Sequence, residues 1–275
     1  MQALNNLIEQ YKVASASDPV TYAVPVFVLF IAIEIFLSIR QKLNLYETKE
    51  AAASIAMGIG VAILGIALKF GAFVMYLAAY QYAPESWKTT LGMGNWYSWV
   101  ILVFADDFIF YWYHRMSHSV RLFWAAHETH HSAKTLNLAV ALRQSWTEPL
   151  YKFFMWVPLA LIGFHPIAIL MMMSFSLIYQ FFMHTETVYK LGPLEWFFNT
   201  PSHHRVHHAT NIQYLDRNHA GMLIIWDRLF GTFVEEQADD KPIYGTRKGV
   251  YHTNPLKIAS HELIDLWQDV RRARN

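Results

Sequence analysis

The histidines of this chain stand in short runs whose spacing is that of metal ligands. The sequence has 275 residues and 14 histidines, none of them before residue 114. Helical residues three or four positions apart share a face, so their imidazole rings can reach a common ion. Neutral imidazole is a common ligand of zinc, copper and iron. Three runs have this spacing: His114 and His118; His127, His130 and His131; and His204, His207 and His208.

The clustered histidines are too many for a single ion. The three runs supply eight ligands, and we expect His184 and His203 to add a ninth and a tenth. A four- or five-coordinate ion cannot use so many, so the sequence predicts two metal ions per chain. Nitrogen ligands with open positions suit iron, zinc or copper, and ligand type alone leaves that choice open. We interpret His165, His252 and His261, which stand apart from the runs, as structural residues.

The second run has another interpretation. His127 to His131 fits H-E-x-x-H, the pattern of zinc metalloproteases, with Glu128 as general base. The longer zincin motif is absent, because residues 134–137 offer neither the glycine nor the third histidine. A protease also leaves the other two runs without a role. A pH sensor would need only a few histidines, and eight charged rings close together would repel one another. A metal carrier would need a polar path through a bilayer, whereas the runs follow apolar segments.

Each metal-bound ring also needs a partner for its second nitrogen. Six polar residues near the runs are candidates: Asp107, Glu128, Glu148, Glu186, Asn199 and Asp216. Among them we expect Asp107, Glu128, Glu186 and Asn199 to support the ligands. Asp107 is favoured most, because a carboxylate inside a membrane span is costly and tends to face a functional interior.

Long apolar segments must position these residues. Apolar residues make up 54% of the chain and charged residues 16%, whereas soluble domains have about 25% charged residues. The pattern predicts an all-α, multi-pass integral membrane bundle that forms a single domain over residues 1–275. The predicted spans are residues 21–39, 51–82 and 96–113, with a helical hairpin at 150–183. Residues 114–149 and 184–275 would form a histidine-rich cap.

The basic residues orient this bundle. Arg40, Lys42 and Lys49 follow the first span, whereas the segment between the second and third spans holds only Lys88. Positive loops face the cytoplasm, so we expect the cap and its metal site to be cytoplasmic. The net charge of +1 offers no footprint for nucleic acid. The absence of cysteine excludes disulfides, thiolate zinc sites and iron–sulfur clusters.

Further stretches carry a family resemblance that runs from about Asp107 to Glu236. They include Asn199-Thr-Pro-Ser-His-His-Arg-Val-His-His208 and Trp226-Asp-Arg-Leu-Phe-Gly-Thr-Phe233, beside the histidine runs themselves. On these residues the sequence resembles the fatty acid hydroxylase/sterol desaturase superfamily of integral membrane di-iron enzymes. Within it, the chain is most similar to the alkylglycerol monooxygenase branch. His219 departs from the pattern, because the family usually has tyrosine there.

The resemblance implies two iron ions at the histidine runs and dioxygen as the oxidant. It implies a membrane lipid as substrate, with a fatty acyl, alkylglycerol ether or sterol-like chain that becomes hydroxylated. It also implies an external electron donor, either a protein or a pterin such as tetrahydrobiopterin. A lipid desaturase of the same superfamily and an intramembrane H-E-x-x-H protease remain the alternatives.

Overall fold

The computed structural model describes residues 2–249 and 251–273, and this part of the chain is helical without any β-strand. An isolated bridge joins Phe198 and Leu223. The all-α prediction is therefore confirmed. The α-helices are α1 (Gln2–Ala16), α2 (Pro19–Gln41), α3 (Thr48–Tyr80), α4 (Glu85–Thr90), α5 (Trp96–Ser119), α6 (Arg121–His131), α7 (Pro149–Lys152), α8 (Val157–Leu161), α9 (Pro166–Phe181), α10 (Pro201–His208), α11 (Ile225–Phe230) and α12 (Pro255–Ala273).

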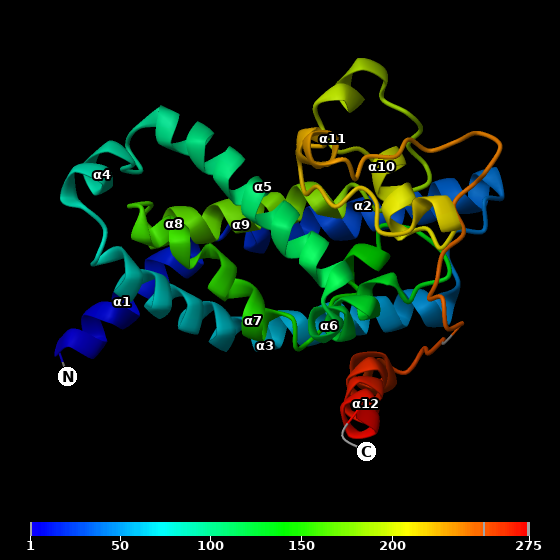
Figure 1. Cartoon of the computed structure of the whole chain (residues 1–275), viewed down its shortest axis with the longest axis horizontal. Coiled ribbons are helices and arrows are strands. Elements are labelled where there is room, and N and C mark those ends of the chain that lie inside the picture. Colours follow the sequence, from blue (N-terminus) through cyan, green and yellow to red (C-terminus); the bar gives the residue numbers. More distant parts are fainter. Residues whose placement is uncertain (1, 250, 274–275) are drawn as a thin grey trace.

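The long helices α2, α3, α5 and α9 form an elongated bundle. Figure 1 shows α2, α3 and α9 extending along the longest axis of the molecule and α5 crossing them obliquely, with α6, α10 and α11 gathered toward one end and α4 at the other. The helices α6 and α10 carry the second and third histidine runs. The bundle therefore brings all three runs to the same end.

Two stretches of the described chain are long and apolar enough to cross a membrane. They are Asn5–Gln41, which contains most of α1 and all of α2, and Thr48–Tyr80, which is α3. Only 22% and 17% of their most apolar windows are buried. The core helix of a soluble protein would be mostly buried, so this exposure favours contact with lipid. The predicted third span lies within α5, which is not among these stretches, and the hairpin helices are shorter.

Local chemistry explains where the long helices begin and end. Asp18 precedes α2 and its side chain accepts a hydrogen bond from the Val20 amide, while Pro19 occupies the first turn. Lys42 ends α2 in the left-handed conformation, with φ of 56°. Glu47 caps α3 through the amides of Lys49 and Glu50. These caps place the helix ends within three residues of the predicted spans.

The third apolar segment and the first histidine run form one continuous helix. Helix α5 extends from Trp96 through His114 and His118 to Ser119. The first histidine run therefore continues the apolar helix, which places both rings on one helical face.

A helical hairpin occupies the predicted region near residues 150–183. Its first arm is divided into α7, a 3-10 turn (Phe153–Trp156) and α8, while its second arm is the regular helix α9. The turn between the arms contains Gly163, whose φ is 109°. A Cβ atom there would lie 3.0 Å from the backbone of Trp87, so the turn requires glycine for both reasons.

One glycine of α3 is predicted to be sensitive to added volume. A Cβ on Gly60 would lie 2.4 Å from Nε1 of Trp146, which is held by a 3.1 Å hydrogen bond to the Met57 carbonyl. Gly60→Ala should destabilise the protein by about 1–3 kcal/mol through overpacking. Thermal unfolding in detergent should show a midpoint lower by several degrees.

Gly65→Ala on the same helix is the matched control, because nothing lies within 4 Å of the position that its added methyl group would take. It should leave the unfolding midpoint unchanged or raise it, since alanine favours the helix over glycine. Equal midpoints for the two variants would contradict the close contact between α3 and Trp146.

Candidate metal centre

The structure gathers nine histidines into two groups. Within each group, the ring nitrogens that could bind a metal all lie within 4.8 Å of one another. They come from α5, α6, α10 and the turn that follows α9. The first group contains His114, His118, His127, His131 and His207. The second group contains His130, His184, His204 and His208. We call them the five-histidine group and the four-histidine group.

Helices α6 and α10 each contribute to both groups in a reciprocal manner. The i and i+4 residues of α6, His127 and His131, belong to the five-histidine group, while the i+3 residue His130 belongs to the other. Helix α10 does the opposite, because His204 and His208 join the four-histidine group and the i+3 residue joins the five-histidine group. The i+3 position lies on the other flank of the helical face, so two facing helices can serve two centres.

The nitrogens have the separation expected around a cation. In the four-histidine group, His184 Nε2 lies 3.1 Å from His130 Nε2 and 2.9 Å from His204 Nε2. In the five-histidine group, His127 Nε2 lies 3.0 Å from His114 Nε2. Nitrogens bound at about 2.1 Å to one ion are about 3.0–3.4 Å apart for angles of about 90–109°.

Hydrogen bonds on the far side of the rings leave the lone pairs directed inward. Nδ1 of His114 donates to the His219 carbonyl at 2.8 Å, and Nδ1 of His207 donates to the Arg217 carbonyl at 3.0 Å. Each of these neutral rings then carries its lone pair on Nε2. Within the described chain, the buried Nε2 of His207 has no hydrogen-bond partner. Converging lone pairs without protons repel one another, so the residues present fit a bound metal ion.

Backbone carbonyls and two acids provide the outer partners of other ligands. His184 Nδ1 lies 2.8 Å from the Gln180 carbonyl. His118 Nδ1 lies 3.3 Å from Asp216, and His127 Nδ1 lies 3.9 Å from the buried Glu148. Two of the six acceptor candidates, Glu148 and Asp216, therefore do face ligand rings. Such contacts fix the orientation and tautomer of metal-bound imidazoles.

Burial favours the neutral form of several of these rings. Burial, reinforced by neighbouring histidines, lowers the pKa of His131, His204, His207 and His208 well below the usual range. Burial lowers the pKa of His184 to about 4. Neutral imidazole is the form that binds a metal ion, so the environment prepares the ligands before any ion arrives.

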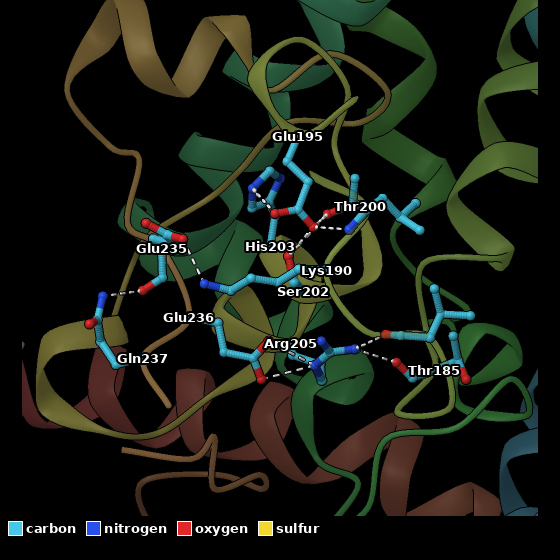
Figure 2. Close-up of polar contacts among 12 residues, drawn as sticks. Thr185, Lys190, Glu195, Thr200, Ser202, His203, Arg205, Glu235, Glu236 and Gln237 are labelled. Atoms are coloured by element: carbon cyan, nitrogen blue, oxygen red, sulfur yellow. Dashed lines mark hydrogen bonds and ion pairs between the residues drawn. The ribbon is translucent and has the colours of Figure 1, made fainter. Parts of the chain in front are cut away.

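His203 departs from its expected place. It is almost fully buried, but it lies outside both groups. Its ring is 5.3 Å from Phe233, and its Nε2 is 3.9 Å from Glu195. Figure 2 shows it beside Glu195, which accepts hydrogen bonds from Thr200 and Ser202. Adjacent helical residues point about 100° apart, so His203 cannot share the direction of His204.

The four residues expected to support the ligands have other partners. Asp107 accepts hydrogen bonds from the Met222 and Leu223 amides and from Trp226 Nε1. Glu128 lies 2.8 Å from His261 of α12. Their place in the sequence is close to the ligands, but the direction of each side chain depends on distant segments. The other two contacts are Glu186 with Tyr244, and Asn199 with the carbonyls of Ala220 and Gly221.

His219 is a residue of this site that the sequence did not reveal. Its ring lies 5.0 Å from His118 and 5.8 Å from both His114 and His207. Its carbonyl accepts the His114 hydrogen bond. It stands outside the three runs, so spacing carried no signal, and only its unusual place in the family pattern marked it.

Glu34 was visible in the sequence only as a charge within the first span. It is buried and accepts hydrogen bonds from Tyr46 and Thr185, and from the Leu138 amide at 2.8 Å. Thr185 directly follows the ligand His184. Glu34 therefore anchors α2 to the turn that carries this ligand.

Arg205 fixes α10 to the same turn. It pairs with Glu236 at 2.7 Å and donates to the carbonyls of Thr185 and Val188 at 3.0 and 2.7 Å. Figure 2 shows these contacts radiating from its guanidinium group. Because Arg205 follows His204, these contacts hold α10 against the turn that carries His184, and the two are among the three segments that supply the four-histidine group.

Comparison with known proteins agrees with this geometry. Residues 99–232 match the fatty acid hydroxylase family. The chain is 42% identical to human alkylglycerol monooxygenase over 192 residues, which cover 70% of this chain and 42% of the human protein. It is 34% identical to alkylglycerol monooxygenase of Xenopus tropicalis over 256 residues, which cover 93% of this chain and 56% of the relative.

The chain therefore belongs to the fatty acid hydroxylase family, with the matching segment containing all nine grouped histidines. It spans about half the length of the curated alkylglycerol monooxygenases it matches. It is also 28% identical over 151 residues to ornithine lipid hydroxylase OlsE of Rhizobium tropici, covering 54% of this chain and 44% of that protein. No solved structure matches the chain.

The adjacent residues His203 and His204 offer a direct test of the two groups. His204→Ala removes a ring of the four-histidine group, so the purified protein should lose about one of its metal ions, measured by inductively coupled plasma mass spectrometry. His203→Ala should keep the full metal content, because its ring touches neither group. Equal loss in both variants would show that the division of the ligands is incorrect.

Proposed function

We propose that this protein is an oxygen-dependent lipid hydroxylase with two iron ions per chain. The observation that carries the proposal is the division of nine histidines, all buried or nearly so, into two adjacent groups of five and four. Two neighbouring iron centres would share the electrons needed to use dioxygen, whereas acid–base side chains alone cannot carry out this oxidation. The family and the printed activities of the relatives support the same class of reaction.

Iron bound here would supply the oxidising power for an unactivated C–H bond, and the protein would supply its placement. The five-histidine group would hold the more completely coordinated ion. The four-histidine group would leave more open positions for oxygen and substrate. The carbonyls of Gln180 and His219 keep the lone pairs of His184 and His114 directed at the centres. Burial excludes water from both groups.

The position of Glu128 argues against the protease alternative. In an H-E-x-x-H protease, this carboxylate activates the metal-bound water. Here it points to α12, where it lies 2.8 Å from His261 Nε2. His130, which a protease would use only as a spacer, belongs to the four-histidine group. A desaturase of the same superfamily uses the same metal centre, so it stays the closest alternative.

We propose a membrane lipid as the substrate. The alkylglycerol monooxygenases that the chain matches act, by name, on alkylglycerols, and the bacterial relative acts, by name, on an ornithine lipid. The outward sides of α2 and α3 carry large exposed apolar residues, among them Val28, Phe36, Ile59 and Ile63. This surface would place the bundle in a bilayer as a multi-pass protein and bring lipid chains beside the metal centre. An electron donor, a protein or a pterin, completes the reaction.

The function is tested by oxygen-dependent turnover of the iron-loaded protein. Alkylglycerols, fatty acyl lipids and ornithine lipids should be offered with a tetrahydropterin or a reducing protein under ¹⁸O₂. Mass spectrometry should find one labelled oxygen atom in the product. A new double bond without oxygen would favour the desaturase instead.

Substitutions separate this activity from proteolysis. His130→Ala should abolish lipid turnover and lower the iron content. Glu128→Gln should reduce turnover less than about tenfold, because outer contacts typically cost about 10–100-fold and this one touches no ligand. His165→Ala, far along the chain from the centre, is the control. Loss of activity in Glu128→Gln together with full activity in His130→Ala would end the oxygenase proposal.

We also propose that the metal centre faces the cytoplasm. The chain has no cysteine, so single replacements at the exposed residues Lys42, Glu85 and Lys241 report topology without background. A membrane-impermeant maleimide applied to intact cells should label Glu85→Cys only. Lys42→Cys and Lys241→Cys should react after the membrane is opened. Labelling of Lys241→Cys in intact cells would place the centre outside.

A further inference from the structure

Helix α12 is amphipathic, but its charged face contacts the protein and its apolar face is exposed. The side that contacts the protein carries His261, Glu262, Asp265 and Asp269, which make ion pairs with α6 and with residue 248. Apart from the buried Ile258 and the half-buried Leu263 and Leu266, its large apolar residues point away from the protein. The exposed fractions of Leu256, Ile264, Trp267 and Val270 are 66%, 53%, 60% and 40%. An amphipathic helix in a soluble protein would bury this face.

The ion pairs hold α12 firmly in this orientation. Arg121 of α6 lies 2.9 Å from Glu262 and 3.1 Å from Asp269. Lys248 lies 2.6 Å from Glu262 and 2.8 Å from Asp265. The acidic residues of the helix are thus paired on the protein side. A rotation that buried the apolar face would break all of these contacts.

The outward side of α12 is therefore apolar and positively charged. Lys257, Arg271 and Arg272 are exposed, and the Arg271 guanidinium lies 5.8 Å from the centroid of the Trp267 ring. Exposed tryptophan and leucine beside arginine and lysine are typical of helices that lie in a membrane interface. Basic residues also attract the anionic lipids of the cytoplasmic leaflet.

Helix α12 contacts the bundle at the level where a membrane surface would lie. Its Ile258 packs against Ala53 and Met57 of α3. The exposed isoleucines of α3 begin at this level, with Ile55, Ile59 and Ile63. In Figure 1, α12 leaves the lower side of the bundle across the direction of α3 instead of following it. A helix crossing the spans where their apolar surface begins would lie flat on the bilayer.

We propose that α12 is an interfacial helix whose apolar face, formed by Leu256, Ile264, Trp267 and Val270, inserts into the cytoplasmic leaflet of the membrane. The proposal rests on the membrane placement proposed above. Insertion of such helices reaches about 5–10 Å into the boundary between headgroups and acyl chains. Because the ion pairs of α12 end on α6, which carries His127, His130 and His131, the helix would also fix the metal centre at a set height above the lipid.

Spin labels on the cysteine-free chain test this placement. Trp267→Cys and Val270→Cys would carry labels on the apolar face, and the exposed Gln268→Cys is the matched control on the same helix. The full-length protein is reconstituted in nanodiscs of phosphatidylcholine and phosphatidylserine in a ratio of 3:1. Collision with oxygen reports lipid, and collision with a water-soluble nickel chelate reports solvent. The ratio of oxygen to nickel collisions should be several-fold higher at positions 267 and 270 than at 268.

Two other occupants of this face would give different results. Equal nickel accessibility at positions 267 and 268 would mean that the face is in water, and would overturn the proposal. Labels inaccessible to both reagents, or dipolar broadening that disappears on mixing with unlabelled protein, would indicate a second copy of the chain and also overturn it. Ile63→Cys on α3 tells the two proposals apart. If that label is in lipid while position 267 is in water, only the role of α12 fails; if position 63 is also in water, the membrane placement fails.

Discussion

Nine imidazole rings, packed together at one end of the bundle, must each direct a nitrogen toward one of two shared points. The rest of the structure serves that requirement. Lone pairs that converge without a proton repel, and burial lowers the pKa of rings such as His204 and His208, so protonation does not relieve the repulsion. A metal ion bound between the rings would relieve it, so metal binding would stabilise this end of the bundle.

Helices α6 and α10 each contribute to both histidine groups, so two facing helices bring imidazole nitrogens together at two points. Each helix offers an i, i+3, i+4 triad, and each gives two rings to one group and one ring to the other. The first group is completed by α5, which supplies two further rings. The second is completed by His184 alone. The two histidine groups are therefore adjacent and similar in ligand type, and they differ in the number of rings that they offer.

Distant segments hold the ligand-bearing elements in register. Asp107 of α5 accepts three hydrogen bonds from residues 222–226, so it fixes the chain segment that brings the His219 carbonyl to His114. Glu34, which precedes His184 in the sequence, and Arg205, which follows it, both form hydrogen bonds with Thr185 in the turn that carries His184. These residues are buried and hydrogen-bonded, as polar groups in an apolar interior must be, and Arg205 is also ion-paired with Glu236. They stabilise the centre without touching it.

The H-E-x-x-H pattern illustrates how one motif can carry different chemistry. Helical spacing does place His127 and His131 on one face, as it does in a protease. The residues between them differ from those of a protease in their contacts. His130 belongs to the four-histidine group, and Glu128 points to His261 of α12. The same ionic contact links the metal-bearing helix to the helix whose apolar side is exposed. The glutamate that acts as the catalytic base in a protease therefore connects two helices here.

The sequence by itself determined the helical class, the apolar segments and the histidines of the centre, because these depend on composition and on the periodicity of a single helix. The helices α2, α3 and α5 begin within three residues of the predicted spans, and nine of the ten proposed ligands lie in the two groups. Periodicity fixes which residues share a face, but it does not say what that face meets.

Only the tertiary structure decided how the ligands divide, and it excluded His203, whose ring turns to Glu195. It also replaced the four expected supporting side chains by backbone carbonyls of residues such as Gln180 and His219. Every residue has a carbonyl, so no residue type marks the few that accept these hydrogen bonds. Their selection depends on how segments distant in the sequence pack together, and that is a property of the folded chain alone.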